Sequence, residues 1–284
     1  MVGYTDAPTL TLPPDRVGPL SQTDVTRFDE DGFVIASGLI PQVEVTALID
    51  DFMAIADAGP VPGHFEPRPQ DGQDEQTDPL RTHPRIMHPH LFHQRSMDYL
   101  LDLRITDIVA QLLGEEPLAC QTMLYFKPPG ARGQSLHQDN FYLKVEPGTC
   151  IAAWLALDVV DRANGGLEVV PGTHRMEIFC PEEADPTISF TREYVAPPPG
   201  LAAVPVDMQP GDVLFFNGSL VHGSGPNATA DRFRRSFISH YAPGSTERIH
   251  NGYPTARITG ERVVLPAAQG GGPCGTEFDD LAVH

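Results

Sequence analysis

The sequence predicts a mainly β protein: a double-stranded β-helix (jelly-roll, cupin-like) core with flanking N-terminal α-helices. Helical periodicity is confined to residues 21–114, and short β-rich runs bounded by Gly, Pro or Asn follow it. No convincing crossover helix separates these runs, which favours antiparallel strands over a parallel α/β sheet. The 29 prolines and 26 glycines among 284 residues suit a fold with many turns, and 40% hydrophobic residues suit a packed core.

The N-terminal third is where the helices are predicted. Residues 1–20 are proline-rich with little periodicity, so we expect an extended N-terminal arm. Ser21 is the predicted N-cap of a short helix, because its hydroxyl can accept a hydrogen bond from a free N–H group of the first turn. A strand is expected over residues 32–36. Pro41 then begins a longer amphipathic helix, which Gly59 ends.

A further helix is predicted over residues 96–113, where apolar residues recur at helical spacing and Gly114 supplies the stop. The preceding residues 60–94 are polar and proline-rich, and long irregular segments of this kind often close over a site. This segment carries a basic cluster formed by Arg81, His83, Arg85, His88, His90 and His93. No carboxylate or thiolate completes a metal site there, so we expect a lid or a substrate-pocket segment.

Seven β-rich runs are predicted after Gly114, at residues 119–126, 136–145, 150–160, 167–170, 202–207, 212–216 and 235–241. We expect one domain over residues 21–250, with a helical flank at 21–114 and a jelly-roll core at 115–250. Residues 251–284 are Gly-rich and acidic at their end, which predicts a C-terminal surface tail.

Charge and cysteine content narrow the range of partners and compartments. Lys and Arg number 19 against 38 Asp and Glu, and a formal net charge of −19 without a basic run argues against nucleic acid and anionic membrane surfaces. No run approaches the ~20 apolar residues of a transmembrane helix. The four cysteines form no CxxC pair, which predicts a reduced, cytoplasmic protein. Nothing in the sequence specifies an oligomeric state.

The segment around His137 carries the first candidate metal ligands. If residues 136–145 form a strand, alternation places His137, Asp139 and Phe141 on one face. His222, which follows a buried strand and precedes a glycine-rich loop, is the candidate third ligand. Two histidines and one carboxylate form the facial triad of non-haem Fe(II) oxygenases, which leaves three coordination positions open. Structural zinc instead fills four positions with protein ligands.

An arginine cluster lies shortly after His222. Arg232 and Arg234 precede a predicted strand, and a guanidinium there can form a bidentate pair with the far carboxylate of a dicarboxylate cosubstrate. Both arginines are candidates for this role. The competing interpretation is a non-enzymatic jelly-roll binding module in which His222 is an ordinary loop histidine. The intact triad followed by an arginine argues against it.

With these motifs the chain resembles the phytanoyl-CoA dioxygenase (phytanoyl-CoA hydroxylase-like) family of Fe(II)/2-oxoglutarate-dependent dioxygenases. The resemblance extends from about Asp24 to Tyr241. It rests on Asp31-Gly-Phe-Val, Met123-Leu-Tyr-Phe-Lys-Pro-Pro-Gly130, His137-Gln-Asp139, Ala153-Trp154-Leu-Ala-Leu-Asp158, Asn164-Gly-Gly-Leu-Glu-Val-Val-Pro-Gly-Thr-His174, Pro210-Gly-Asp-Val and His222-Gly-Ser-Gly-Pro-Asn227.

The resemblance implies that His137, Asp139 and His222 bind Fe(II) and that Arg234 holds the distal carboxylate of 2-oxoglutarate. The gap between His222 and Arg234 is one residue longer than the family pattern, so Arg232 remains a rival. The resemblance also implies that Met123, Trp154 and Ser224 contact the cosubstrate, and strand alternation from Met123 adds Gln121 as a neighbouring candidate. Candidate substrate contacts are Arg85, His88 and Phe141.

The reaction implied by the resemblance uses O2 and 2-oxoglutarate and releases succinate and CO2. We expect hydroxylation of an unactivated aliphatic carbon of a small organic molecule, because related halogenases replace the carboxylate ligand with Gly or Ala, whereas this chain has Asp139. The alternative is desaturation, epoxidation or oxidative cyclisation of a natural-product intermediate at the same iron centre. The sequence does not identify the substrate.

Overall fold

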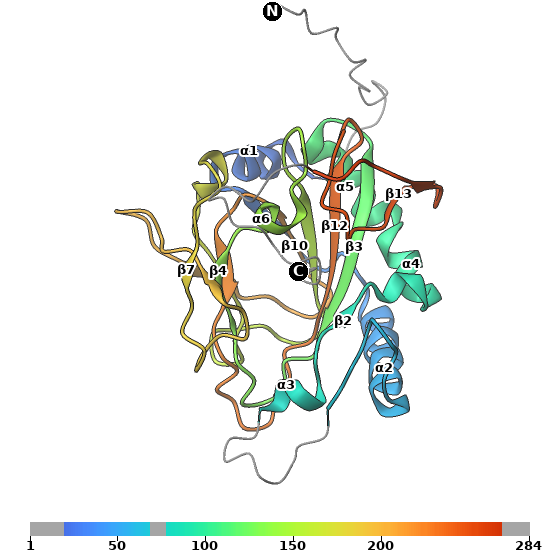
Figure 1. The fold of residues 1–284 in the computed structure, drawn as a ribbon, viewed down its shortest axis with the longest axis vertical. Coiled ribbons are helices and arrows are strands. Elements are labelled where there is room, and N and C mark those ends of the chain that lie inside the picture. The colour runs from blue at the N-terminus through green and yellow to red at the C-terminus, as the bar shows by residue number, and fades with distance from the viewer. Residues whose placement is uncertain (1–19, 69–77, 269–284) are drawn as a thin grey trace, which may run out of the picture.

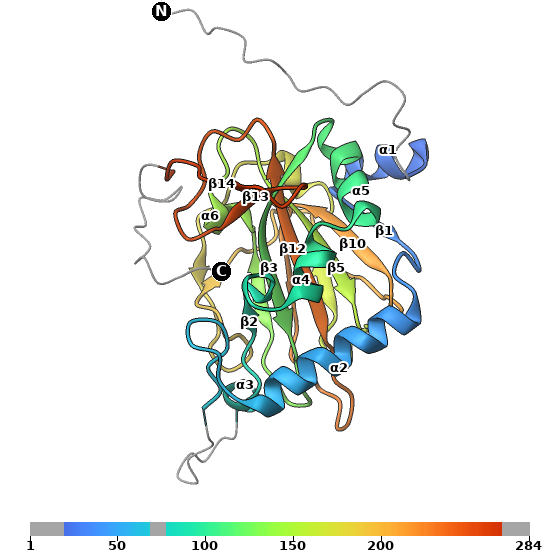
Figure 2. The same cartoon turned by 90° about the vertical axis from the view of Figure 1, so that its right-hand side faces the viewer.

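The computed structural model describes residues 20–68 and 78–268, so residues 1–19 of the predicted arm lie outside it. Two antiparallel sheets face each other, and helices from the N-terminal third cover the outer face of the larger sheet (Figure 1, Figure 2). This arrangement confirms the predicted jelly roll with flanking N-terminal helices.

The strands of the described residues pair antiparallel throughout both sheets. The larger sheet contains, in spatial order, β1 (Phe33–Ala36), β10 (Val213–Asn217), β5 (Ile151–Ala156), β12 (Ser236–Pro243), β3 (Pro117–Tyr125), β13 (Thr255–Arg257) and β14 (Arg262–Val263), with β2 (Ile86–Met87) also paired to β3. The facing sheet contains β4 (Gln134–His137), β11 (His222–Ser224), β6 (Leu167–Val169) and β9 (Val204–Pro205). A separate hairpin joins β7 (Glu182–Glu183) and β8 (Glu193–Tyr194).

The first two helices begin where the sequence predicts. Helix α1 (Gln22–Asp31) is capped by Ser21, whose hydroxyl accepts a hydrogen bond from the Asp24 backbone N–H at 3.2 Å. Helix α2 (Gln42–Ala58) begins directly after Pro41, which occupies the N-cap position with an extended backbone (φ −60°, ψ 145°).

The predicted helix over residues 96–113 is two helices, α4 (Gln94–Leu100) and α5 (Leu103–Leu113). The break has a local cause, because the Asp102 side chain accepts a hydrogen bond from the Arg104 backbone N–H at 2.8 Å and so caps a new helix. The remaining short helical segments are α3 (Pro79–Thr82), α6 (Asn140–Leu143), and the 3₁₀ turns η1 (Pro89–Leu91) and η2 (Thr173–Arg175).

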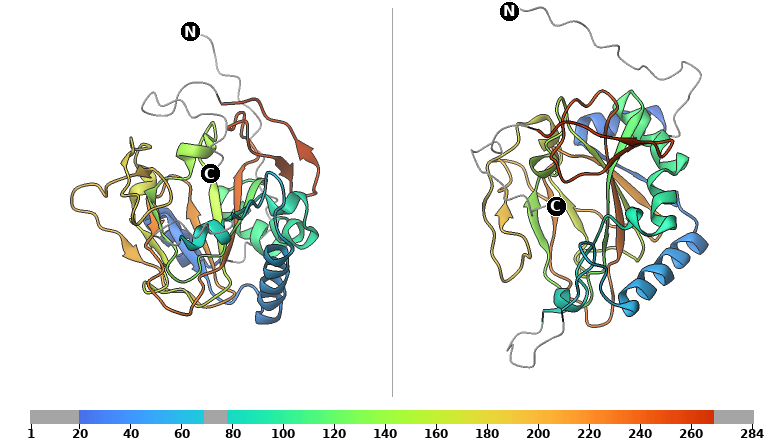
Figure 3. Two further views of the ribbon diagram at one scale, coloured as in Figure 1. Left: turned by 60° about the horizontal axis from the view of Figure 1, so that its bottom comes forward. Right: turned by 45° about the vertical axis from the view of Figure 1, so that its right-hand side comes forward.

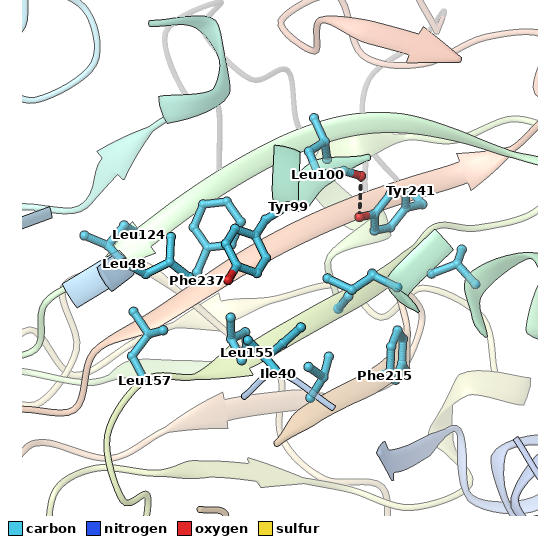
Figure 4. Packing of buried hydrophobic residues seen from close by; sticks show 14 of the residues in the cluster. Ile40, Leu48, Tyr99, Leu100, Leu124, Leu155, Leu157, Phe215, Phe237 and Tyr241 are labelled. Carbon is cyan, nitrogen blue, oxygen red and sulfur yellow. Dashed lines mark hydrogen bonds between the residues drawn. The ribbon is translucent and has the colours of Figure 1, made fainter. Parts of the chain in front are cut away.

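A hydrophobic core joins the helices to the outer face of the larger sheet (Figure 4). Leu48 of α2 and Tyr99 of α4 pack near Phe237 of β12, and the Tyr241 hydroxyl donates a hydrogen bond to the Leu100 carbonyl at 2.8 Å. Because side chains alternate along β12, Ile238 lies on the opposite face, in a second core between the two sheets. The inner face of the larger sheet is therefore the one that meets the smaller sheet.

Residues 136–145, predicted as one strand, are a strand end followed by a helical turn. Strand β4 ends at His137, and α6 begins at Asn140. The Asn140 side chain stabilises this turn by accepting a hydrogen bond from the Val145 backbone N–H at 2.9 Å. A short apolar run fits either a strand or a buried helical turn, and here the tertiary packing selects the turn.

The structure differs from two other expectations, which concern the C-terminal tail and the cysteines. Within the predicted C-terminal tail, β13 pairs with β3, so residues 255–257 extend the larger sheet. In Figure 3 these C-terminal strands are the red ones beside the larger sheet. Cys120 and Cys150 are free and buried, but Cys180 takes part in a disulfide bond. The prediction of reduced cysteines is wrong at Cys180, because spacing along the chain does not reveal which sulfur atoms approach each other.

Candidate metal and cosubstrate site

Three buried side chains converge between the sheets, where strands β4 and β11 lie side by side. His137 ends β4 and His222 begins β11, and the two residues are direct partners across the strands. Asp139 follows two residues after His137, and its Oδ1 lies 3.4 Å from His137 Nε2 and 3.5 Å from His222 Nε2. One ligand atom from each residue falls within 4.8 Å of the others, which is the spacing needed to share a metal ion.

Asp139 reaches this position by a route that differs from the predicted one. It is not on a strand with His137 but has helical backbone angles (φ −61°, ψ −37°) at the start of α6, and this turns its carboxylate back toward both imidazoles. The same turn directs Phe141 into a buried cluster with Tyr142 and Cys150. Phe141 therefore does not share a face with the two ligands, and it does not line the cavity.

Backbone carbonyl groups orient both imidazoles. His137 Nδ1 donates to the Ser135 carbonyl at 2.7 Å, and His222 Nδ1 donates to the Leu220 carbonyl at 2.9 Å. Since a carbonyl can only accept, each ring carries its proton on Nδ1 and presents the Nε2 lone pair toward Asp139. Burial lowers the pKa of His222 to about 4, despite the opposing effect of Asp139, so this ring is neutral at neutral pH.

The carboxylate of Asp139 is held from its other side by His240 of β12. His240 Nε2 donates to Asp139 Oδ2 at 3.0 Å, which leaves Oδ1 directed at the two ligand histidines. Burial raises the pKa of Asp139, but His222, His240 and the hydrogen bonds outweigh it and hold the pKa well below its usual range. Two imidazole nitrogens and one anionic oxygen match the donor set of a non-haem Fe(II) centre.

A buried cation lies further along the same cavity. Arg234 is 3% exposed, its guanidinium carbon lies 5.3 Å from the Trp154 ring centre, and it donates to the Gly165 carbonyl and to Ser236 Oγ. Arg232, in contrast, lies at the surface in a 2.7 Å ion pair with Asp161. The structure thus places Arg234, and not Arg232, in the lining of the cavity.

The cavity brings most of the predicted site residues together and leaves three out. Its lining includes the triad together with Met123, Trp154, Ser224, Arg234 and Arg85. Gln121 is fully buried on β3 opposite His240 and does not line the cavity. His88 also lies outside the lining, in a left-handed conformation (φ 50°) against the Thr122 carbonyl.

Sequence reasoning did not single out His240 or Lys127 as site residues, although both line the cavity. His240 lies within the predicted strand over residues 235–241, and strand alternation from Arg234 through Ile238 places it on the cavity face. Lys127 follows the predicted strand over residues 119–126 and also lines the cavity. A lysine among apolar neighbours is a weak signal, because its side-chain nitrogen is often at the surface.

Comparison with known proteins gives a consistent family match. A model of the phytanoyl-CoA dioxygenase (PhyH) family matches residues 28–236. A probable phytanoyl-CoA dioxygenase from Caenorhabditis elegans is 33% identical over 180 residues, covering 58% of this chain and 56% of that protein. Methylphosphonate hydroxylase from Gimesia maris is 26% identical over 227 residues, covering 78% and 81% of the two chains.

The fold also matches solved structures. The non-haem α-ketoglutarate-dependent carbocyclase SnoK from nogalamycin biosynthesis superimposes with a TM-score of 0.64 at 20% identity, covering 88% of this chain and 89% of that one. The chain spans about half the length of the curated phytanoyl-CoA dioxygenases that it matches. None of the helices in the described part of the chain is long and apolar enough to span a membrane.

Proposed function

Because this chain belongs to the phytanoyl-CoA dioxygenase family, we propose that it is an Fe(II)/2-oxoglutarate-dependent dioxygenase that hydroxylates an unactivated aliphatic carbon of a small organic molecule. The observation that carries this proposal is one cavity that holds both a His-Asp-His cluster and a buried arginine. The cluster has the donor set for iron, and the arginine has the charge for the distal carboxylate of 2-oxoglutarate.

In this proposal His137, Asp139 and His222 hold Fe(II), and the protein positions the other reactants around it. When bound, iron and 2-oxoglutarate supply the oxidising chemistry, in which O2 is consumed, succinate and CO2 are released and a C–H bond of the substrate is oxidised. Arg234 orients the cosubstrate through its far carboxylate, and Trp154 and Met123 line the apolar wall beside it. The apolar wall excludes water, which limits unproductive side reactions.

The mouth of the cavity is where we place the organic substrate. Leu80, Tyr125 and Phe190 line it, and the Arg85 guanidinium carbon lies 5.9 Å from the Phe190 ring centre. An apolar rim with one cation suits a substrate that has both a hydrocarbon portion and an anionic or polar group. This placement supports Arg85 as a substrate or cosubstrate contact, as the sequence predicts.

The test is aerobic incubation of the protein with Fe(II), 2-oxoglutarate and a panel of small organic acids, esters and phosphonates, with succinate and product mass as readouts. We expect substrate-stimulated succinate formation and a product heavier by one oxygen atom. Asp139→Ala serves as the matched inactive variant. Failure of the wild-type protein to bind Fe(II) would refute the proposal.

A second candidate reaction is supported by the structural likeness to a carbocyclase. The same iron centre would then remove two hydrogen atoms from the substrate and close a ring or form a double bond. Product mass separates the reactions, because hydroxylation or epoxidation adds one oxygen whereas desaturation or oxidative cyclisation removes two hydrogens. Hydroxylation is our primary proposal, and it agrees with the similarity to methylphosphonate hydroxylase.

A further inference from the structure

Lys127 is a buried lysine that lines the cavity, and the proposed reaction assigns it no role. It is 3% exposed and adopts a left-handed backbone conformation (φ 41°). Its Nζ donates to the Gly165 carbonyl at 2.9 Å and to Ser224 Oγ at 2.8 Å. A lysine ammonium has three N–H donors, so one remains available to a ligand in the cavity.

Lys127 and Arg234 form a pair of cations joined through one backbone carbonyl. Arg234 Nε donates to the same Gly165 oxygen, at 3.2 Å, that accepts from Lys127. Within the described residues neither cation takes part in an ion pair. The carboxylate of Asp158 attracts Arg234 through space, but it forms an ion pair with Arg235 at 2.7 Å. The carboxylate of Glu168 attracts Lys127 in the same way, but it forms an ion pair with Arg162 at 3.6 Å.

Two adjacent buried cations without a counterion are costly to maintain. Burial, followed by repulsion from Arg234, holds the pKa of Lys127 well below its usual range, and burial lowers the pKa of Arg234 to about 10. Buried charges of this kind are normally paired. An anion that enters the cavity would supply the missing counter-charge.

The backbone around Lys127 is shaped to admit its side chain. Gly165 has a positive φ of +72°, and a Cβ atom there would lie 2.7 Å from Lys127 Cε and 2.5 Å from the Gly225 carbonyl oxygen. A larger residue at position 165 would displace the lysine. The ammonium therefore occupies a site that the loop leaves open for it.

We propose that Lys127 and Arg234 together bind the distal carboxylate of the dicarboxylate cosubstrate, and that Lys127 also orients Ser224 toward it. This inference rests on the proposed function and adds a second cation to its cosubstrate site. Because Ser224 Oγ accepts from Lys127, the hydroxyl proton of Ser224 is free to donate to the carboxylate. Lys127, Arg234 and Ser224 would then present three kinds of donor to one end of the ligand.

The test compares two ligands that differ only at that end. 2-Oxoglutarate has a distal carboxylate, whereas 2-oxopentanoate carries a methyl group there. Binding to the Mn(II)-loaded protein is followed by the fluorescence of Trp154, the only tryptophan, which lies beside Arg234. For Lys127→Met we expect the Kd of 2-oxoglutarate to rise about tenfold to a hundredfold, and that of 2-oxopentanoate to change by less than about threefold.

Controls separate this inference from a general structural effect. Lys144→Met removes the only other lysine, which does not line the cavity, and should leave both Kd values unchanged. Lys127→Arg keeps the charge and should retain a preference for 2-oxoglutarate. Equal losses for both ligands in Lys127→Met, or no loss for 2-oxoglutarate, would overturn the inference.

A measurement on the wild-type protein covers the case in which Lys127→Met does not fold. Calorimetry in buffers of different ionisation enthalpy, repeated over a pH series, should show proton uptake on 2-oxoglutarate binding at pH values above the lowered pKa of the free lysine, because the carboxylate favours the ammonium form of Lys127. 2-Oxopentanoate should cause less uptake, and equal uptake for the two ligands would refute a role for the lysine. If the wild-type protein binds neither Mn(II) nor 2-oxoglutarate, the proposed function itself fails.

Discussion

His240 Nε2 donates a hydrogen bond to Asp139 Oδ2 at 3.0 Å, across the space between β12 of the larger sheet and the start of α6. Both side chains are almost completely buried. This bond restrains one carboxylate oxygen, so that the other faces His137 and His222. The larger sheet thereby helps to position the proposed metal site, whose three candidate ligands come from the region of the smaller sheet.

Removing this restraint should weaken metal binding. We predict that His240→Ala raises the Kd for Fe(II) by about 10- to 100-fold, the range usual for loss of a hydrogen bond to a ligand. His240→Gln retains an N–H donor and should lose less. Anaerobic titration with Fe(II), or with Mn(II) as a stable substitute, measures the effect.

The matched control for His240 is Tyr241→Phe, a neighbour on the same strand that points to the helices instead of the cavity. It should bind metal as the wild-type protein does. If His240→Ala also binds metal with wild-type affinity, the hydrogen bond has no positioning role.

Asp139→Ala should abolish substrate-coupled succinate formation, because it removes the anionic ligand of the proposed iron site. The protein should fold with some loss of stability, because the buried His240 donor loses its carboxylate partner while no side chain is enlarged. Succinate release, metal titration and thermal unfolding check these points together. Full activity in Asp139→Ala would mean that the ligands are assigned wrongly.

Variants of Arg234 and Arg232 distinguish which arginine binds the distal carboxylate of 2-oxoglutarate. Arg234→Met should raise the Kd of 2-oxoglutarate on the order of a hundredfold, because a buried charged partner of the ligand is lost. Arg232→Met removes only a surface ion pair with Asp161 and should leave the Kd unchanged. Calorimetric titration of the Mn(II)-loaded variants tests both outcomes, and the reverse ranking would assign the carboxylate to Arg232.

Tyr241→Phe should destabilise the fold by about 1 kcal/mol, because the Leu100 carbonyl loses a buried hydrogen bond. The change leaves the packed ring in place, so no large cavity forms. Tyr194→Phe, on the short hairpin strand β8, is the control and should have little effect. Urea unfolding gives both free energies, and equal effects would show that the Tyr241 hydroxyl contributes nothing specific.

Local patterns in the sequence were sufficient for much of the fold. The Ser21 cap, the helix after Pro41 and the antiparallel strands follow from short-range hydrogen bonding and residue periodicity, and these are encoded by near neighbours. The same patterns failed at residues 136–145, where a buried apolar run satisfies either a strand or a helical turn.

The sequence by itself determined which residue types could build an iron and 2-oxoglutarate site, and it named His137, Asp139, His222 and Arg234 as candidates. Only the tertiary structure decided how they meet. It turned Asp139 toward the histidines through α6, buried Arg234 in the cavity while it left Arg232 at the surface, and brought His240 and Lys127 into the same cavity. The physical reason is that burial and cross-strand contacts depend on segments far apart in the chain, and no local pattern specifies which buried charge faces which.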